Sequence, residues 1–174
     1  MDGFGFEKPN EGKSNDWITP KGIIDALGHF DLDPCESDNQ PWSCAARGYR
    51  LGRGEDGLVL PWDSADVYLN PPYGPHVDKW ADKLAEHGIG VMLIFLRSET
   101  QAWQKIFTQA DGYLMLASRI CFRLPDGKRA KSGTAPSCLV AYGQHNVQRL
   151  RQCGLSGALF GKAEMVGKVK VSGL

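Results

Sequence analysis

Short apolar runs and segments with helical spacing alternate along the middle of the chain. The runs at residues 67–69, 89–96 and 112–117 predict strands, and the second has the continuous hydrophobicity of a strand buried on both faces. Between them, apolar residues recur at helical spacing over 77–85 and 103–107, which predicts two amphipathic helices. The succession of strand, helix, strand, helix and strand predicts an α/β fold with a mostly parallel sheet and right-handed crossovers.

Capping residues mark where these helices and an earlier one begin and end. Thr19 and Pro20 predict an N-cap followed by proline at the first position of a short helix, which Gly28 ends. Gly88 stands at the stop position of the helix over 77–85. The sequence Ser-Glu-Thr-Gln at 98–101 has the pattern of a capping box that opens the next helix.

The first predicted strand ends in an acidic loop. Phe30 and Leu32 indicate a strand, and Asp33-Pro34-Cys35 follow it directly. Carboxylates at the tip of a strand lie where open α/β sheets bind their ligands. Residues 36–61 are rich in Gly, Arg, Asp and Ser, which indicates an irregular connection with at most one short strand near 49–51.

The pattern changes after residue 117. Residues 120–124, the turn Pro-Asp-Gly at 125–127 and the apolar run 138–142 predict a late antiparallel hairpin that completes the sheet edge, with a basic loop at 125–136. Residues 146–153 predict a short helix.

The length and composition fit one globular domain. The chain has 174 residues, of which 42% are hydrophobic and 23% charged, and this profile is typical of a domain with its own core. We expect a flexible arm over 1–15, the domain over 16–153, and a loose Gly- and Lys-rich tail over 154–174. No apolar run approaches the ~20 residues that a membrane-spanning helix needs, so no membrane partner is expected.

Five cysteines form an odd set without C-x-x-C spacing, and the four histidines fall at no zinc-site spacing. We therefore expect neither a disulfide framework nor a bound metal. The formal net charge is zero, but it is unevenly distributed: residues 1–118 carry 10 basic and 18 acidic side chains, and residues 119–174 carry 10 basic and 2 acidic. A basic cluster around the late turn can bind phosphates, although a solvated basic face would have the same composition.

Asn70-Pro71-Pro72-Tyr73 is the strongest chemical signal, because it follows a buried strand directly. The exocyclic amine of a nucleobase is a poor nucleophile unless acceptors bind its two hydrogens and leave its lone pair free. The Asn70 side-chain oxygen and the Pro71 carbonyl can be those acceptors, and the fixed φ of the prolines holds the turn in place. The Tyr73 ring offers a flat surface on which an extruded base can stack. We predict that these four residues are catalytic.

The turn belongs to a series of seven sequence blocks between about residues 16 and 142. They are Asp16-Trp17-Ile18-Thr19-Pro20, Phe30-Asp31-Leu32-Asp33-Pro34-Cys35, Gly57-Leu58 through Pro61-Trp62, Leu69-Asn70-Pro71-Pro72-Tyr73-Gly74, Arg97-Ser98-Glu99-Thr100, Ser118-Arg119-Ile120-Cys121-Phe122 and Ala135-Pro136-Ser137. In this order they resemble the phage-type Dam family of DNA N6-adenine methyltransferases. The resemblance implies a Rossmann-like methyltransferase fold, S-adenosylmethionine as methyl donor, and adenine in double-stranded DNA as acceptor. It also implies action in the cytoplasm, that of the host cell if a phage encodes the protein.

The resemblance also assigns cofactor-binding residues. Trp17, Thr19 and Pro20 match a motif that lines the cofactor pocket, and the strand-end motif at 31–35 faces the methionine and ribose parts. A carboxylate there suits the ammonium group and hydroxyls of that cofactor, although it can also cap a turn. The cofactor-binding residues that we predict are Trp17, Thr19, Pro20, Asp31, Asp33, Pro34, Cys35 and Asp63. The glycine-containing cofactor loop common in such folds is replaced by Cys35-Glu36-Ser37.

Arginines and lysines around the late hairpin, together with one at the end of a strand, are candidates for DNA binding. Helix capping and internal ion pairs are the alternative roles for Arg97 and Arg119. The DNA-binding residues that we predict are Arg97, Arg119, Arg123, Lys128, Arg129 and Lys131. No protein partner is evident, and the sequence leaves the oligomeric state open.

Other functions fit part of the pattern. The turn at 70–73 also suits transfer to cytosine N4, to guanine N2 of RNA or to glutamine amides, since each presents a planar amine. A non-catalytic protein that binds cofactor or DNA is a further alternative. Pro34-Cys35 resembles the nucleophile of cytosine-5 methyltransferases, but Glu36 stands where those enzymes have glutamine, and we expect Cys35 to be a wall of the cofactor pocket.

Overall fold

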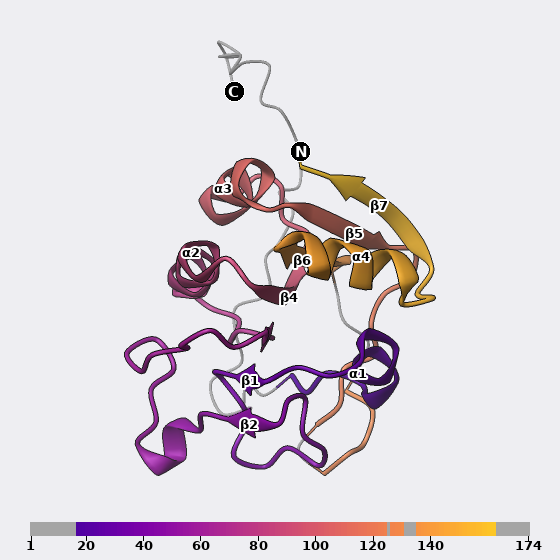
Figure 1. Ribbon diagram of the computed structural model, residues 1–174. Helices are drawn as coiled ribbons and strands as arrows, with labels where there is room; N and C mark the ends of the chain where they lie inside the picture. Colours follow the sequence, from indigo (N-terminus) through magenta and orange to yellow (C-terminus); the bar gives the residue numbers. More distant parts are fainter. Residues whose placement is uncertain (1–16, 125, 131–134, 163–174) are drawn as a thin grey trace, which may run out of the picture.

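The computed structural model describes residues 17–124, 126–130 and 135–162. Within this part of the chain a seven-stranded sheet carries helices on both faces (Figure 1). The strands are β1 (Leu32–Asp33), β2 (Arg47–Gly48), β3 (Val67–Leu69), β4 (Gly90–Phe95), β5 (Gly112–Leu116), β6 (Ser137–Tyr142) and β7 (Gly157–Gly161). The helices are α1 (Lys21–Leu27), α2 (Val77–His87), α3 (Gln101–Gln109) and α4 (Gln144–Gln152), with a 3-10 turn η1 at Leu51–Arg53.

The strand order is β2-β1-β3-β4-β6-β5-β7. The first four strands in this order are parallel, β6 is antiparallel to both β4 and β5, and β7 is antiparallel to β5. The predicted α/β class is confirmed, and the sheet as a whole is mixed, with parallel pairs at one end and antiparallel pairs at the other. Thus α2 is the helical crossover between the parallel strands β3 and β4.

The position of β6 differs from the prediction of a strand at the sheet edge. It lies between β4 and β5, so β5 does not extend the parallel part of the sheet as the sequence predicted. All six residues of β6 are buried, and an inner strand with helices on both sides buries its side chains in this way. The preceding residues 120–124 form no strand of the sheet; Arg123 makes isolated bridges to Ile18 and Arg129 instead.

The edge strand beside β5 is β7, within the segment for which we expected a loose tail. It pairs with β5 from Gly112↔Gly161 to Leu116↔Gly157, and the Phe160 ring stacks on Tyr113 with centroids 5.7 Å apart. The expectation is therefore wrong for residues 157–161. Glycine at both ends of a five-residue strand hid it, because glycine weakens the strand pattern. The arm expected over 1–15 and the rest of the tail, 163–174, lie outside the described residues.

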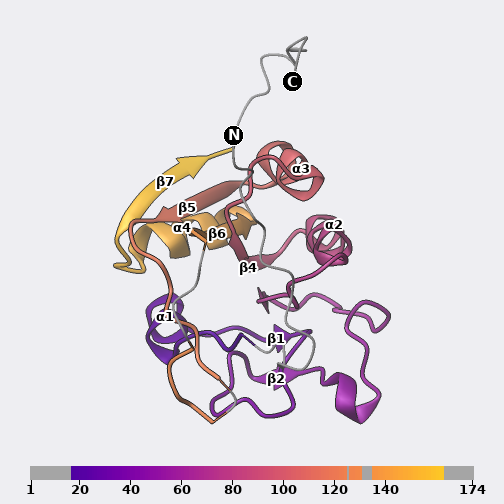
Figure 2. The same ribbon diagram turned by 180° about the vertical axis from the view of Figure 1, so that it is seen from behind.

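Two hydrophobic layers cover the two faces of the sheet. The layer under α2 and α3 includes Trp80 and Trp103, and it packs on Met92 and Ile94 of β4. The layer under α1 and α4 packs on the alternate β4 residues Val91 and Leu93. Figure 2 shows α1 and α4 on one side of the strands and α2 and α3 on the other. The continuous apolar run over β4 is thus explained by burial on both faces.

Two predicted helix caps are wrong. The Thr19 hydroxyl bonds the Tyr68 hydroxyl at 2.7 Å, and Pro20 takes the N-cap position of α1 without a side-chain cap. Thr100, rather than Ser98, caps α3, since its hydroxyl accepts from the Trp103 N–H at 3.4 Å. The Thr19 hydroxyl has a tertiary partner and the Thr100 hydroxyl is the one that reaches α3, and the sequence pattern predicts neither. None of the described helices combines the length and apolar character that crossing a lipid bilayer requires.

Candidate functional site

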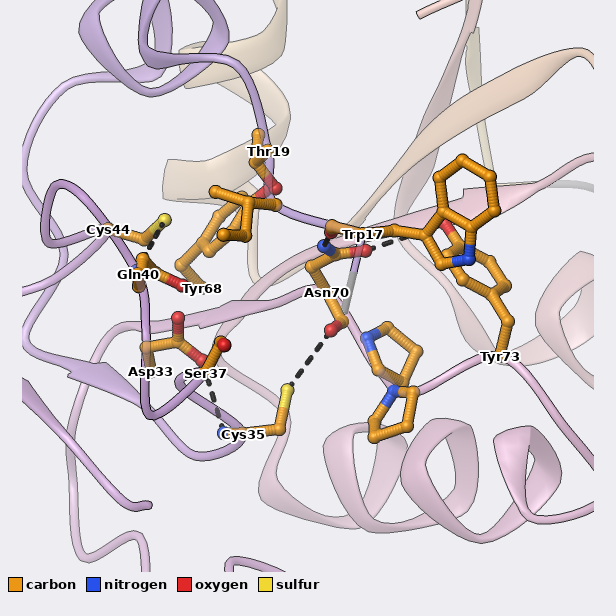
Figure 3. Close-up of a pocket in the computed structure, with 13 residues that line it drawn as sticks. Trp17, Thr19, Asp33, Cys35, Ser37, Gln40, Cys44, Tyr68, Asn70 and Tyr73 are labelled. Carbon is orange, nitrogen blue, oxygen red and sulfur yellow. Dashed lines mark hydrogen bonds between the residues drawn. The ribbon is translucent and has the colours of Figure 1, made fainter. Parts of the chain in front are cut away.

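The connections from β1 and β3 leave the sheet in opposite directions. The chain passes from β1 to β2 on one side and, after β3, to β4 on the other. An open α/β sheet has its binding crevice at such a switch point, outside the carboxyl ends of the strands. A cavity of about 40 Å³ lies there (Figure 3). It is lined by Trp17, Ile18, Thr19, Asp33, Cys35, Ser37, Gln40, Cys44, Tyr68, Asn70, Pro71, Pro72 and Tyr73.

The Asn70 side chain has a fixed orientation in this cavity. Its Nδ2 donates to the Trp17 carbonyl oxygen at 2.6 Å. That oxygen can only accept, so the amide nitrogen must face Trp17 and Oδ1 must face the other way. Oδ1 accepts a long hydrogen bond, 3.4 Å, from the Tyr73 hydroxyl. Trp17 is 53 residues from Asn70 in the chain, so only the tertiary structure reveals this contact.

The loops after β1 and β3 are joined by a thiol. The Cys35 Sγ donates to the Asn70 carbonyl oxygen at 3.2 Å, as the dashed line in Figure 3 shows. Burial raises the pKa of the Cys35 thiol well above its usual value, with a further contribution from the charge of Asp33. A thiol held in its neutral form is a poor nucleophile, in agreement with the interpretation of Cys35 as a wall of the pocket.

Asp33 is the buried carboxyl group of the cavity, with 3% of its surface exposed. Its Oδ1 accepts from the Cys35 N–H at 3.1 Å. Burial is the largest influence on it and raises the pKa of Asp33 to about 7. A cationic ligand group beside this carboxyl would favour its ionised form and would be bound by it.

Several cavity residues were not found from the sequence. Tyr68 is fully buried and bonds Thr19, and the Gln40 side chain donates to the Cys44 Sγ at 3.3 Å. The Tyr68 hydroxyl was detectable in principle, because a tyrosine in an otherwise aliphatic strand needs a polar partner for its hydroxyl. Ser37, Gln40 and Cys44 belong to the irregular connection between β1 and β2, for which no local pattern indicates a position.

Tyr73 is half-buried in an aromatic cluster. Its ring stacks on Phe95 with centroids 4.1 Å apart and an interplanar angle of 23°, and it meets Phe122 edge-on at 6.2 Å. Phe122 in turn contacts the Trp17 ring at 5.8 Å. One face of Tyr73 is therefore already covered, which leaves the other face for the base stacking that we predicted.

Asp31 lies away from the cavity, at the amino end of β1. Its carboxylate accepts from the Asp66 N–H at 2.8 Å and lies 3.5 Å from the His29 ring. It lines a separate groove with Asp66 and Arg149. The prediction that Asp31 faces a ligand together with Asp33 does not match this placement, because Asp31 precedes the strand and Asp33 ends it.

The other predicted cofactor residues are not on the cavity wall. Asp63 is exposed on the connection between β2 and β3, and its carboxylate is 3.4 Å from Arg47. Pro34 is buried behind the wall, where its carbonyl oxygen would be only 1.8 Å from a Cβ added to Gly57. Pro20 lies at the start of α1. Trp17, Thr19, Asp33 and Cys35 are therefore the predicted cofactor residues that the structure brings together.

The predicted DNA-binding residues are spread over three places. Arg97 lines a second cavity beside the first, and Arg119 and Arg123 line a groove next to α1. Lys128 forms an ion pair with Asp126 at 2.9 Å, and the Arg129 guanidinium donates to the Cys121 Sγ at 3.2 Å. Lys131 lies outside the described residues.

The segment with Arg123 is attached to the cavity wall. Ile18 and Arg123 exchange two backbone hydrogen bonds, of 3.0 and 2.8 Å. Ile18 follows Trp17, whose carbonyl orients Asn70. A basic segment and the amide of the candidate site are thus neighbours in space.

Neither a family model, nor a curated protein, nor a solved structure that was compared matches this chain. Across the described residues, no three His, Cys, Asp or Glu side chains are grouped so that they could hold a metal ion. The polar groups of the cavity, one buried carboxyl and several hydroxyl and amide groups, instead suit an organic ligand with a cationic part.

Proposed function

We propose that the chain is an S-adenosylmethionine-dependent methyltransferase that acts on the N6 amine of adenine in double-stranded DNA. The orientation of the Asn70 amide carries the proposal. Its nitrogen is occupied by the Trp17 carbonyl. Its oxygen accepts one long hydrogen bond, from the Tyr73 hydroxyl at 3.4 Å, and keeps a second lone pair for an incoming amine. Among the described residues, no backbone N–H donates to the Pro71 carbonyl oxygen. Two acceptors on one rigid turn match the two hydrogens of an amine.

These two acceptors would activate the amine by fixing its orientation. Hydrogen bonds to Asn70 Oδ1 and the Pro71 carbonyl fix the plane of the NH₂ group and direct its lone pair away from the turn. The two prolines lock φ near −65°, so the acceptors need no rearrangement when the substrate arrives. The face of Tyr73 opposite Phe95 would support the base by stacking, which is worth about 1–3 kcal/mol.

The polar residues of the cavity match the polar groups of S-adenosylmethionine, which supplies an electrophilic methyl group when bound. Asp33 would hold its ammonium group or ribose hydroxyls, and Thr19 and Trp17 line the same wall. The enclosed volume of about 40 Å³ holds one or two water molecules. Trp17 and the loop over 35–44 would therefore have to move apart for this ligand to enter.

The basic residues favour a nucleic acid over a protein substrate. Arg119 and Arg123 lie on the side of the cavity where Ile18 pairs with the basic segment. Phosphate contacts by such residues position DNA without reading its sequence. Nothing in the site favours cytosine N4 or another amine over adenine N6, so these alternatives are distinguished by identifying the product.

The experiment is methyl transfer from labelled S-adenosylmethionine to unmethylated genomic DNA, with the modified nucleoside identified by mass spectrometry. We expect N6-methyladenine from the natural protein and a loss of at least about 100-fold in rate for Asn70→Ala, since a preorganised contact is removed. Gln148→Ala is the matched control, because its amide is exposed on α4, outside the cavity and outside the loop over 35–44.

An Asn70→Ala protein with full activity would overturn the mechanism. N4-methylcytosine as product would overturn the choice of adenine. Binding of S-adenosylmethionine without methylation of any DNA or RNA would favour the non-catalytic alternative.

A further inference from the structure

The two edge strands of the sheet differ in length and in charge. One of them, β2, has two residues, and Arg47 is one of these. The other, β7, has five residues, Gly157–Gly161, without a charged side chain or a proline, and its pairing with β5 contains no bulge. Figure 1 shows β7 as the outermost strand beside β5. Soluble proteins commonly protect a sheet edge by a short strand, charges, proline or a bulge. The strand β2 is protected in this way, and β7 is not.

The outer side of β7 presents backbone groups that β5 does not bind. The Ala117 N–H donates to the Ser156 carbonyl oxygen at 2.9 Å, so the backbone groups of Ser156 face the β5 side. Backbone groups alternate between the two sides of an antiparallel strand, and those of Ala158 and Phe160 therefore also face β5. The strand residues whose N–H and C=O groups face outward are Gly157, Leu159 and Gly161.

This edge is complementary to a second copy of itself. In an antiparallel pair centred on a two-fold axis at Leu159, the outward groups of Leu159 meet the same groups of the second copy. Gly157 then lies opposite Gly161 of the second copy, and their outward groups meet in the same way. Ala158 lies opposite Phe160 of the second copy, so a small side chain faces a large one.

Exposed apolar surface and the flanking charges also favour this pairing. The Phe160 side chain is 45% exposed although its ring stacks on Tyr113, so it has apolar surface left to bury against Ala158 of the second copy. Lys162 is the charged residue that follows the strand, and the two-fold axis places it opposite Ser156 of the second copy. No like charges therefore face each other across the paired strands.

We propose that two copies of the protein associate through antiparallel pairing of their β7 strands, which joins the two sheets into one. A second copy is favoured over a different partner because each copy offers what the other needs: the same backbone donors and acceptors, glycine opposite glycine, and alanine opposite phenylalanine. The pairing of two five-residue strands gives a small interface, so the dimer forms reversibly. This inference does not depend on the proposed methyltransferase activity.

The first test is analytical ultracentrifugation of the full chain. We expect monomers at about 1 μM and dimers at about 100 μM, in the affinity range of a small interface. A protein that is monomeric at both concentrations overturns the proposal.

Ala158→Lys tests whether β7 forms the contact. Ala158 is exposed, so the variant should fold, which its thermal unfolding at low concentration verifies. The added charge faces Phe160 of the second copy and should raise the dissociation constant of the dimer at least about tenfold. Ala46→Lys is the matched control, because Ala46 is an exposed alanine directly before β2, at the opposite edge of the sheet. It should leave the dissociation constant unchanged, and an equal effect of both variants, or of neither, overturns the proposal.

Amide hydrogen exchange of the natural protein locates the contact within the strand. The Leu159 N–H should exchange more slowly at the high protein concentration than at the low one, because only the dimer binds it. The N–H groups of Ala158 and Phe160 should be protected at both concentrations, since they face β5. Protection of Leu159 that does not depend on concentration would show that the same chain covers β7. Dimers without protection of Leu159 would show that another surface forms the contact, and either result overturns the proposal.

Discussion

Asp31 and Asp33 are two residues apart, yet their carboxyl groups lie in opposite electrostatic environments. The exposed Asp31 carboxylate accepts a hydrogen bond from the Asp66 backbone, which lowers its pKa. Asp33 is buried in the candidate site, and burial raises its pKa to about 7. A buried carboxyl that is not fully paired is typical of functional sites. The two groups should therefore affect the pH dependence of stability with opposite sign.

We predict that Asp33→Asn removes a loss of stability that the natural protein shows with rising pH. Between its unfolded pKa near 3.8 and its folded pKa of about 7, Asp33 binds more protons in the native than in the unfolded state. Its contribution to the free energy of unfolding therefore falls as pH rises through this window, by about 4 kcal/mol in total. Urea unfolding of both proteins from pH 4 to 8 measures the difference, which should grow in favour of the variant and level off above pH 7.

Asp31→Asn is the companion variant. Because the folded pKa of Asp31 is lowered, its stabilising contribution is present above its unfolded pKa and is lost as pH falls through the folded value. The variant should be less stable than the natural protein at pH 7 and should approach it in acid. Parallel pH profiles for Asp33→Asn and the natural protein would contradict the prediction, because they would show that the pKa of Asp33 is the same in the folded and unfolded states.

In helix α3 the sequence pattern and the structure assign the N-cap to different residues. Thr100 has the extended backbone of an N-cap, and its hydroxyl accepts from the Trp103 N–H. Ser98 lies two residues earlier and is exposed. The sequence contains both hydroxyl groups, and only the turn formed between Arg97 and Thr100 decides which of them reaches the helix.

We predict that Thr100→Ala lowers the free energy of unfolding by about 1 kcal/mol, because an N–H of the first helical turn loses its acceptor. Ser98→Ala should change it by less than about 0.5 kcal/mol, as exposed substitutions usually do. Chemical denaturation at a fixed pH measures both. If Ser98→Ala lowered the free energy of unfolding as much as Thr100→Ala, Ser98 would contribute to the cap as the sequence pattern predicted.

In the whole molecule, β7 is the last strand at the antiparallel end of the sheet. The strand covers β5, which would otherwise be an edge with unpaired backbone groups. Gly157 is close to the backbone of β5: a Cβ there would lie 2.4 Å from the Met115 carbonyl oxygen. At Gly161, at the other end of the same strand, nothing lies within 4 Å of an added Cβ.

Gly157→Val should therefore destabilise the protein by about 1–3 kcal/mol, because the side chain forces the two strands apart. Gly161→Val makes the same substitution in the same strand and should be neutral or slightly stabilising, since valine favours extended backbone. The midpoint of thermal unfolding compares the two variants. Equal midpoints would mean that β7 contributes little to the folded sheet.

The sequence alone determined the elements with strong local patterns and the residues of the central turn. The helices after β3 and β4 and the strands β3, β4 and β5 lie where hydrophobic spacing predicted them, because spacing reflects which side of each segment is buried. Asn70-Pro71-Pro72-Tyr73 was recognisable because an amide, two prolines and an aromatic ring directly follow a buried strand. Asp33 and Cys35 lie in the same cavity as this turn because parallel strands end at one edge of the sheet.

Only the tertiary structure decided the position of β6, the pairing of β7 and the contact between Trp17 and Asn70. It also decided that Asp31 lies apart from Asp33. Each of these depends on which distant segments pair, and local periodicity contains no information about that choice. The orientation of the Asn70 amide, on which the proposed chemistry rests, is set by a carbonyl group 53 residues away.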